Sequence, residues 1–303
     1  MAAKVPAAKT TGLPGLPRGF RLTSGDRVLI PDPGVTKLEL AQFYARIAAH
    51  VLPGLVGRPL SLVRCPDGGA GECFFQKHPS AGMNSSIRQF ELREPDGKRA
   101  TYFSIEDITG LLGLVQVNAV EIHPWGARVR DVERPDRLVL DLDPAPDVPF
   151  RAVIAGAREI RERLAAQDLD SWVRTSGGKG LHVVVPLVPA ASWDEARAFA
   201  QALARDMEAD SPDNYVSVAA KDRRAGRIFI DYLRNARGAT SVASYTVRNR
   251  AGAPVATPLS WQELGRVRSG AQFTIRNIER RLARMRTDPW AALATARQKL
   301  PRH

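Results

Sequence analysis

The stretch PDRLVLDLDPAP, residues 135–146, ends an apolar run with a pair of aspartates. Side chains alternate along a strand, so the three leucines share one face while Val139, Asp141 and Asp143 share the other. Residues two apart on a strand are ~7 Å apart, which lets both carboxylates converge on one or two cations. Acidic pairs also end strands in plain solvent, so this stretch alone leaves a metal site and a solvated strand end both open.

A third carboxylate follows on another apolar strand, GRIFIDYLRN, residues 226–235, where Asp231 is the only acid. Like charges brought together raise one another's pKa, and a bound divalent cation removes that conflict. Carboxylates suit hard cations such as Mg²⁺, and paired ions drive phosphoryl transfer. Asp141, Asp143 and Asp231 are therefore candidate ligands of divalent cations, with acids that merely end their strands in solvent as the alternative.

Between these strands lies a glycine-rich segment, RTSGGKGLHVVV, residues 174–185. Its three glycines allow a sharp turn whose N–H groups can face an anion. Ser176 adds a hydroxyl, Lys179 a positive charge, and His182 a ring donor. The spacing is not that of a Walker A loop, and a strand follows in place of a helix. The segment favours a phosphate cradle, with an ordinary hairpin turn as the alternative.

Basic residues flank the third acidic strand in KDRRAGR, residues 221–227, and SYTVRNR, residues 244–250. Arg224, Arg227 and Arg248 could each reach a triphosphate, although an ordinary basic face explains any one of them. His123 stands at a strand end before a proline, where a lone histidine is usually structural. The combination is informative: an acid pair, a glycine-rich turn, a third acid and flanking arginines together indicate metal-dependent nucleotidyl transfer.

Composition points to a polyanionic partner. Among 303 residues, 44 Lys and Arg outnumber 32 Asp and Glu, giving a net charge of +12 and a pI of about 10.3. Nucleic acid is the simplest such partner; a membrane-surface helix is disfavoured because the basic residues are not gathered on one helix. Without a membrane-length apolar run or an apolar leader, we expect a cytoplasmic protein. Cys65 and Cys73 form no CxxC motif and are expected to be reduced thiols.

The order of elements predicts an α/β or α+β fold without internal repeats. Residues 1–20 are small, Pro-rich and cationic, which is typical of a disordered lead. A helix is expected from Thr36, which forms a capping box with Glu39. Further helices are expected over about 104–117, 150–167, 192–210 and 274–286, and strands near 58–68, 71–78, 119–125, 137–143, 171–176, 181–188 and 227–235.

The motifs DLDP, TSGGKGLH and FIDYLRN, in this order, closely resemble the polymerase domain of bacterial DNA ligase D. That domain belongs to the archaeo-eukaryotic primase superfamily and serves non-homologous end joining. The resemblance extends over residues 21–290. It implies an RRM-like catalytic sheet, at about 116–290, packed against a smaller N-terminal αβ unit, at about 21–115, with 291–303 as a tail.

The resemblance also implies roles for individual residues. Asp141, Asp143 and Asp231 would hold two Mn²⁺ or Mg²⁺ ions. The incoming nucleotide would be bound by His123, Ser176, Lys179, His182, Arg224 and Arg248. Arg27 and Lys37 would bind the 5′-phosphate of the downstream DNA. Phe74 and Phe75 fall where the family stacks template bases, but adjacent strand residues face opposite ways, so at most one is expected to stack and both could be core residues.

The implied activity is extension of DNA 3′ ends with NTPs or dNTPs, ribonucleotides being preferred, to fill gaps during break repair. Implied partners are gapped or broken DNA, a Ku-like end-binding protein and a DNA ligase, because the chain has no KxDG ligase motif and is a stand-alone relative or an excised domain. A haloacid-dehalogenase phosphatase also uses DxD, but Ala145 stands where its motif has Thr or Val. A primase and a non-catalytic end-bridging module remain alternatives.

Overall fold

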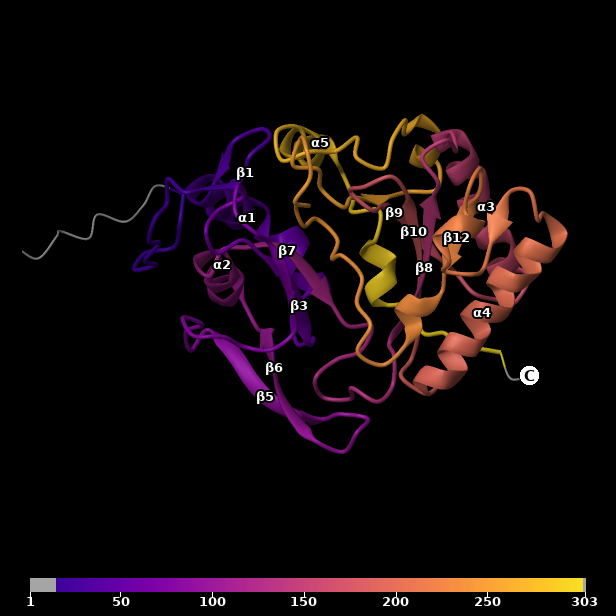
Figure 1. Ribbon diagram of the computed structural model, residues 1–303, viewed down its shortest axis with the longest axis horizontal. Coiled ribbons are helices and arrows are strands. Elements are labelled where there is room, and N and C mark those ends of the chain that lie inside the picture. Colours follow the sequence, from indigo (N-terminus) through magenta and orange to yellow (C-terminus); the bar gives the residue numbers. More distant parts are fainter. Residues whose placement is uncertain (1–14, 302–303) are drawn as a thin grey trace, which may run out of the picture.

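The computed structural model describes residues 15–301 as a mixed α+β protein (Figure 1). The predicted disordered lead therefore lies outside the described residues up to position 14. Leu16 and Phe20 pack against the core, so the packed chain begins before the predicted boundary at residue 21. The α-helices are α1 (Lys37–Val51), α2 (Ile108–Gln116), α3 (Phe150–Ala165), α4 (Trp193–Asp210) and α5 (Ile278–Arg284).

Thirteen strands of the described chain form four sheets. Those of the smaller sheets are β1 (Val28–Ile30), β2 (Val35–Thr36), β3 (Leu60–Arg64), β4 (Phe74–Gln76), β5 (Ile87–Arg93), β6 (Arg99–Ile105) and β7 (Ala119–Pro124). The largest sheet contains β8 (Arg137–Pro144), β9 (Trp172–Thr175), β10 (Leu181–Pro186), β11 (Tyr215–Val216), β12 (Ile228–Asp231) and β13 (Pro258–Leu259).

The six-stranded sheet has the order β11-β12-β8-β10-β9-β13. Its central part runs β8-α3-β9-β10-α4-β12 along the chain, with the strands arranged β12-β8-β10-β9 and each neighbouring pair antiparallel. This is the β-α-β-β-α-β arrangement of RRM and ferredoxin-like sheets. The predicted RRM-like catalytic sheet is confirmed.

Helices α3 and α4 cover one face of this sheet (Figure 1). The leucines of β8 belong to the buried core on that side, and a Cβ added to Gly156 of α3 would lie 3.1 Å from the Leu142 side chain. Ser192 and Glu195 form the expected capping box of α4. Because side chains alternate, covering the leucine face turns Asp141 and Asp143 to the opposite face.

The N-terminal unit packs α1 and α2 with the three-stranded sheet β4-β3-β7. Thr36 and Glu39 form the predicted capping box of α1. β7 pairs with β3, so this unit extends past the predicted boundary at about residue 115. The hairpin β5–β6 was not predicted, although Asp96–Gly97 between two alternating runs is a hairpin signal, and Gly97 has the positive φ of +84° that such turns require.

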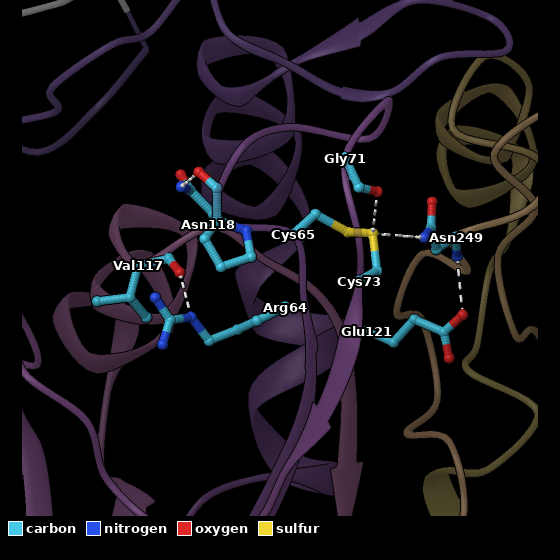
Figure 2. The surroundings of a disulfide bond; sticks show 9 residues. Arg64, Cys65, Gly71, Cys73, Val117, Asn118, Glu121 and Asn249 are labelled. Atoms are coloured by element: carbon cyan, nitrogen blue, oxygen red, sulfur yellow. Dashed lines mark hydrogen bonds between the residues drawn. A yellow bond between two sulfur atoms is a disulfide. The ribbon is translucent and has the colours of Figure 1, made fainter.

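The expectation of two free thiols is wrong, because Cys65 and Cys73 form a disulfide (Figure 2). Cys65 follows β3 and Cys73 precedes β4, and these strands pair antiparallel, which brings the two Cα atoms to 4.3 Å. The Asn249 side-chain amide donates to both sulfurs, at 3.3 Å and 3.6 Å. Sequence spacing alone could not reveal this pair, since the strand pairing creates it.

No helix among residues 15–301 is long and apolar enough to cross a membrane.

Candidate active site

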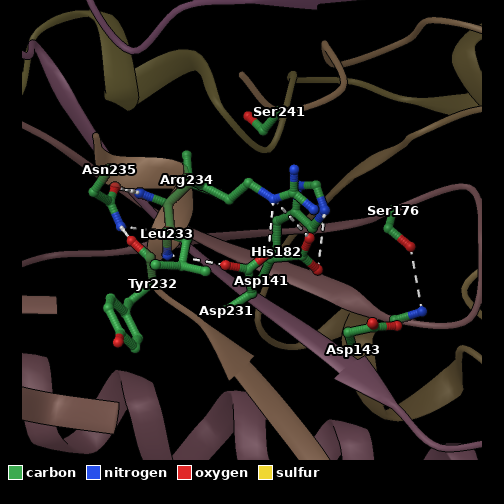
Figure 3. Close-up of polar contacts among 12 residues, drawn as sticks. Asp141, Asp143, Ser176, His182, Asp231, Tyr232, Leu233, Arg234, Asn235 and Ser241 are labelled. Atoms are coloured by element: carbon green, nitrogen blue, oxygen red, sulfur yellow. Dashed lines mark hydrogen bonds and ion pairs between the residues drawn. The ribbon is translucent and has the colours of Figure 1, made fainter. Parts of the chain in front are cut away.

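One rung of the six-stranded sheet brings two of the three predicted acids together. Asp231 lies directly opposite Asp141 across the β12–β8 pair, and His182 lies opposite Asp141 on its other side. Arg174 continues the rung on β9. Directly opposite Cβ atoms on one face are ~5 Å apart. Figure 3 shows Asp141, Asp231 and His182 pointing toward one another on the face away from the helices.

A cationic side chain occupies the space between the acids. Arg234, three residues after Asp231, places its Nε 3.0 Å from Asp231 and 3.5 Å from Asp141 (Figure 3). Asp143, half exposed, forms a separate ion pair with Arg224 at 2.9 Å. Asp141 and Asp231 thus share one arginine while Asp143 has another, and no three acidic, histidine or cysteine side chains of residues 15–301 converge as a ready-made metal cluster.

The three carboxyl groups differ in their affinity for protons. Burial raises the pKa of Asp141, but the neighbouring His182 and Arg234 outweigh burial and hold that pKa at about 2. Burial, together with the charge of Asp141, raises the pKa of Asp143 above its usual value. Burial also raises the pKa of Asp231, against the opposing effect of Arg234. Additional positive charge at this point would stabilise all three anions.

The donor chemistry fits a hard divalent cation. The face presents carboxylate oxygens from three positions and no thiol, which suits Mg²⁺ or Mn²⁺. Arg234 already bridges Asp141 and Asp231 as a tethered cation, so the site attracts positive charge. With a side chain 43% exposed, Arg234 is not locked in by packing.

The glycine-rich turn lies against the end of β8. A Cβ on Gly180 would stand 1.9 Å from the Leu142 carbonyl oxygen, and Gly177 has a φ of +66°. The Ser176 hydroxyl accepts the N–H groups of Gly178 and Gly180, both at 3.2 Å. Two of the N–H groups expected to face an anion are therefore hydrogen-bonded inside the turn. Serine hydroxyls commonly bond to nearby backbone groups in turns. Lys179 is exposed at its tip.

His182 is buried rather than open to a ligand. Its Nδ1 accepts from the Arg174 guanidinium at 3.0 Å and 3.2 Å, so its Nε2 carries the hydrogen and faces Asp141 at 3.4 Å. Burial lowers the pKa of His182, which keeps the ring neutral near pH 7. Its observed contact is with a carboxylate and not with an open phosphate position.

Glu121 forms hydrogen-bonded ion pairs with two of the predicted nucleotide-binding residues, His123 and Arg248. Its carboxylate lies 2.8 Å from His123 Nε2 and 2.9 Å from Arg248 Nε, and it accepts the backbone N–H of Asn249 at 2.8 Å. Burial raises the pKa of Glu121, but these three donors outweigh it and hold the pKa at about 2. Arg248 also donates to the Ser176 carbonyl at 2.7 Å, which connects this cluster to the glycine-rich turn.

The remaining arginine of the predicted set lies beside the acids. Arg224 stacks over Phe229 at 4.1 Å and pairs with Asp143. The six residues predicted to bind the nucleotide thus come from β7, the turn before β10, β10 itself and two loops, and they surround the acidic rung on the face away from α3 and α4.

The two residues predicted to bind a 5′-phosphate lie together in the N-terminal unit. The Lys37 ammonium donates a hydrogen bond to the Gln116 carbonyl at 2.7 Å, and the residue is almost fully buried. Burial and the neighbouring charge of Arg27 lower its pKa to about 8. Arg27 donates to the carbonyl of Pro66, in the loop that the disulfide closes.

Both phenylalanines predicted to meet template bases are exposed, by 43% for Phe74 and 47% for Phe75. The alternative that both are core residues is therefore wrong, while the expectation that at most one of them stacks on a base stays a prediction. β4 is a three-residue strand at the edge of its sheet, so neither side chain is covered. Phe75 contacts the His123 ring edge-on at 5.6 Å, and Arg64 stands 5.9 Å from Phe74.

Three residues of the site were missed from sequence: Arg174, Glu121 and Arg234. All three stand within the motifs that drew attention. Glu121 is two residues before His123 on one strand face, and Arg234 is three residues after Asp231. The i,i+2 and i,i+3 spacings were the available signal.

Comparison with known proteins shows the family of this chain. Residues 36–290 match the family model described as "LigD, primase-polymerase domain". A Pseudomonas aeruginosa "multifunctional non-homologous end joining protein LigD" is 40% identical over 283 residues, 93% of this chain and 34% of that protein. The Bacillus subtilis "bifunctional non-homologous end joining protein LigD" is 28% identical over 86% of this chain and 42% of its own length. The chain thus spans about a third to two fifths of these relatives.

A solved structure has the same fold. It is described as the polymerase domain from Mycobacterium tuberculosis ligase D in complex with DNA, and it is 29% identical with a TM-score of 0.83, covering 93% of this chain and 99% of that one. The family match and the shared fold both identify the family of this chain. The acidic rung beside a glycine-rich turn is consistent with that family. The chain belongs to the LigD primase-polymerase domain family and is a nucleotidyltransferase.

Proposed function

We propose that this chain extends DNA 3′ ends with nucleoside triphosphates, using two metal ions and preferring ribonucleotides, to fill gaps during end joining of DNA breaks. The observation that carries the proposal is the rung of the sheet on which Asp231 faces Asp141, with Asp143 two residues farther along β8. Such a row of carboxylates beside a basic, glycine-rich turn suits metal-dependent phosphoryl transfer.

The acidic and the basic residues of the site would have different roles. Asp141, Asp143 and Asp231 would hold the ions, which when bound activate a primer 3′-hydroxyl and neutralise the pyrophosphate leaving group. Lys179, Arg224 and Arg248 would bind the triphosphate.

Two buried contacts would keep this machinery in place. His182 donates to Asp141 and fixes its orientation. The Glu121 carboxylate accepts from Arg248 and His123 and fixes the orientation of both side chains.

DNA would be held mainly by the N-terminal unit. Phe74 and Phe75 offer exposed aromatic faces, on which unpaired bases stack for ~1–3 kcal/mol each. Arg27 and Lys37 supply positive charge for a 5′-phosphate. The solved relative contains DNA by its description, which supports a DNA substrate here. A ligase activity and a Ku-like end-binding protein in the bacterial cytosol are the partners we propose.

The test is extension of a 5′-phosphorylated gapped duplex with Mn²⁺ or Mg²⁺, comparing NTPs with dNTPs. We expect extension by the natural chain and loss of at least a thousandfold in Asp141→Asn and Asp231→Asn, since each removes a charge from the ion site. Asp206→Asn, an exposed acid of α4 on the far side of the sheet, is the matched control. Full activity in either rung variant would refute the assignment.

The same assay separates the rival functions. An end-bridging module would shift gapped DNA in a gel and would add no nucleotide with any metal. A primase would synthesise on a single-stranded template without a primer, whereas we expect addition only to an existing 3′ end.

A further inference from the structure

A cavity of about 510 Å³ lies between α5 and the segment that follows β13, away from the acidic rung. Sites that bind small ligands have volumes of ~300–1,000 Å³. Phe273 and Met285 form part of its wall, and Arg280, Arg281 and Arg284 line it as well. Its lining therefore combines apolar surface with three guanidinium groups.

These arginines differ in what they already bind. Arg281 is a structural residue: it pairs with Glu263 at 2.7 Å, donates to the Pro258 carbonyl at 3.0 Å and stacks over Phe273 at 5.2 Å. Arg280 and Arg284 are exposed and have no hydrogen bond or ion pair with any described residue.

The acids of α5 and of the cavity lining are already paired. Glu263 is taken by Arg281, and Glu279 pairs with Arg46 at 2.8 Å. Arg280 and Arg284 are one helical turn apart, where like charges repel by ~0.2–0.5 kcal/mol. Two uncompensated guanidinium groups at the edge of a ligand-sized cavity indicate an anionic ligand, and guanidinium groups match phosphate oxygens in geometry.

The position of the cavity near Lys37 favours DNA as the phosphate ligand. α5 and the residues just before it are tied to α1, because Arg276 pairs with Glu39 at 3.2 Å and Glu279 pairs with Arg46. Glu39 is two residues after Lys37, a candidate 5′-phosphate ligand. Figure 1 shows α5 next to the β1 and α1 region. A DNA strand bound at Lys37 would carry its further phosphates past α5.

We propose that this cavity is a second phosphate-binding subsite, in which Arg280 and Arg284 bind the backbone of the DNA strand that continues from the 5′-phosphate. The inference rests on the proposed binding of gapped DNA and is independent of the nucleotidyl transfer. Free nucleotide has the same phosphate chemistry, so the experiment compares the two sources.

The test uses the full chain with Arg280→Gln and Arg284→Gln combined, which keeps side-chain length and helix propensity. The control combines Arg197→Gln and Arg205→Gln, two exposed arginines of α4 that have no hydrogen bond or ion pair with any described residue. α4 lies on the other face of the sheet from the acids. Binding of a fluorescent, 5′-phosphorylated gapped duplex is measured against salt concentration. Unchanged melting temperatures establish that both variants fold.

Loss of two phosphate contacts lowers the slope of log affinity against log salt by about 2 and weakens binding about tenfold at low salt. We expect these changes in the α5 variant and not in the α4 control, with ATP binding unchanged in both. Equal behaviour of the two variants, or weakening confined to ATP, would overturn the proposal. A natural chain that binds gapped DNA without extending it would refute the proposed function and leave this comparison intact.

Discussion

Gly180 shows how closely the glycine-rich turn approaches the acidic strand β8. An added Cβ would stand 1.9 Å from the Leu142 carbonyl oxygen, a backbone atom that cannot move without disturbing Asp141 and Asp143. The neighbouring Gly178 has room, since its nearest contact would be the Ser176 hydroxyl at 3.4 Å. The two glycines of one turn therefore serve different purposes.

This difference predicts a large effect of an alanine at position 180 and a small effect of an alanine at position 178. Gly180→Ala should push the turn away from β8, lower the melting temperature and reduce nucleotide extension at least a hundredfold, because misplacement by about 1 Å costs that much. Gly178→Ala should remain within a few-fold of the natural chain. Primer extension and thermal melting measure both effects, and comparable losses in the two variants would contradict the argument.

Lys37 predicts a pH dependence for 5′-phosphate binding. Burial and Arg27 lower its pKa to about 8, so the ammonium is charged below that pH and loses its charge as the pH rises through it. Preference for a 5′-phosphate over a 5′-hydroxyl should therefore be greatest below pH 8 and decline above it. Titration of both gapped duplexes measures the ratio of affinities.

Bound phosphate favours the charged amine, so the observed midpoint should lie at or somewhat above pH 8. Lys37→Gln should remove the pH dependence together with much of the preference. A preference that stays constant from pH 7 to pH 10 in the natural chain would show that Lys37 does not contact the phosphate.

At the scale of elements, the disulfide closes the loop between β3 and β4. Gly69 in that loop donates to the Val28 carbonyl at 2.9 Å, and Arg27 donates to Pro66. The bond thus ties the exposed Phe74 and Phe75 to the strand that follows Arg27. A reductant would open this bond, so the stability of the loop should depend on redox conditions.

Replacing both cysteines should have a measurable cost. Closing a loop of this length stabilises a fold by roughly 2–3 kcal/mol, mainly through the unfolded chain. Cys65→Ser with Cys73→Ser should lower the free energy of unfolding by that amount in urea, and dithiothreitol should reproduce the loss in the natural chain. Equal stability with and without reductant, together with two titratable thiols, would contradict this pairing.

At the scale of the whole molecule, two kinds of ion pair join the N-terminal unit to the catalytic part. Glu121 of β7 is 7% exposed and binds Arg248 and Asn249. Arg46 of α1 pairs with Glu279 of α5, where the two side chains are 50% and 41% exposed. Burial distinguishes these contacts, because solvent screens the exposed pair.

Breaking the buried pair should therefore cost more. Glu121→Gln leaves Arg248 without its anion and should destabilise the protein by about 3 kcal/mol, while raising KM for the nucleotide. Arg46→Gln should cost less than about 1 kcal/mol and leave KM unchanged. Urea unfolding and steady-state extension provide both readouts, and similar costs for the two variants would count against Glu121 as the connection.

Much of the site could be predicted from local pattern. Alternation along β8 placed Asp141 and Asp143 on one face, because a strand repeats every two residues whatever surrounds it. The capping boxes at Thr36 and Ser192 were equally local, since all their partners lie within one helical turn.

Other features depended on packing between distant segments. Only strand pairing places Asp231 opposite Asp141, ninety positions apart in sequence, and brings Cys65 to Cys73. Exposure of both Phe74 and Phe75 follows from the edge position of β4, and burial of His182 follows from Arg174 beside it. The sequence by itself determined which side chains share a face. Tertiary structure decided which faces meet and which stay open, because burial and pairing arise from contacts between segments that local periodicity cannot encode.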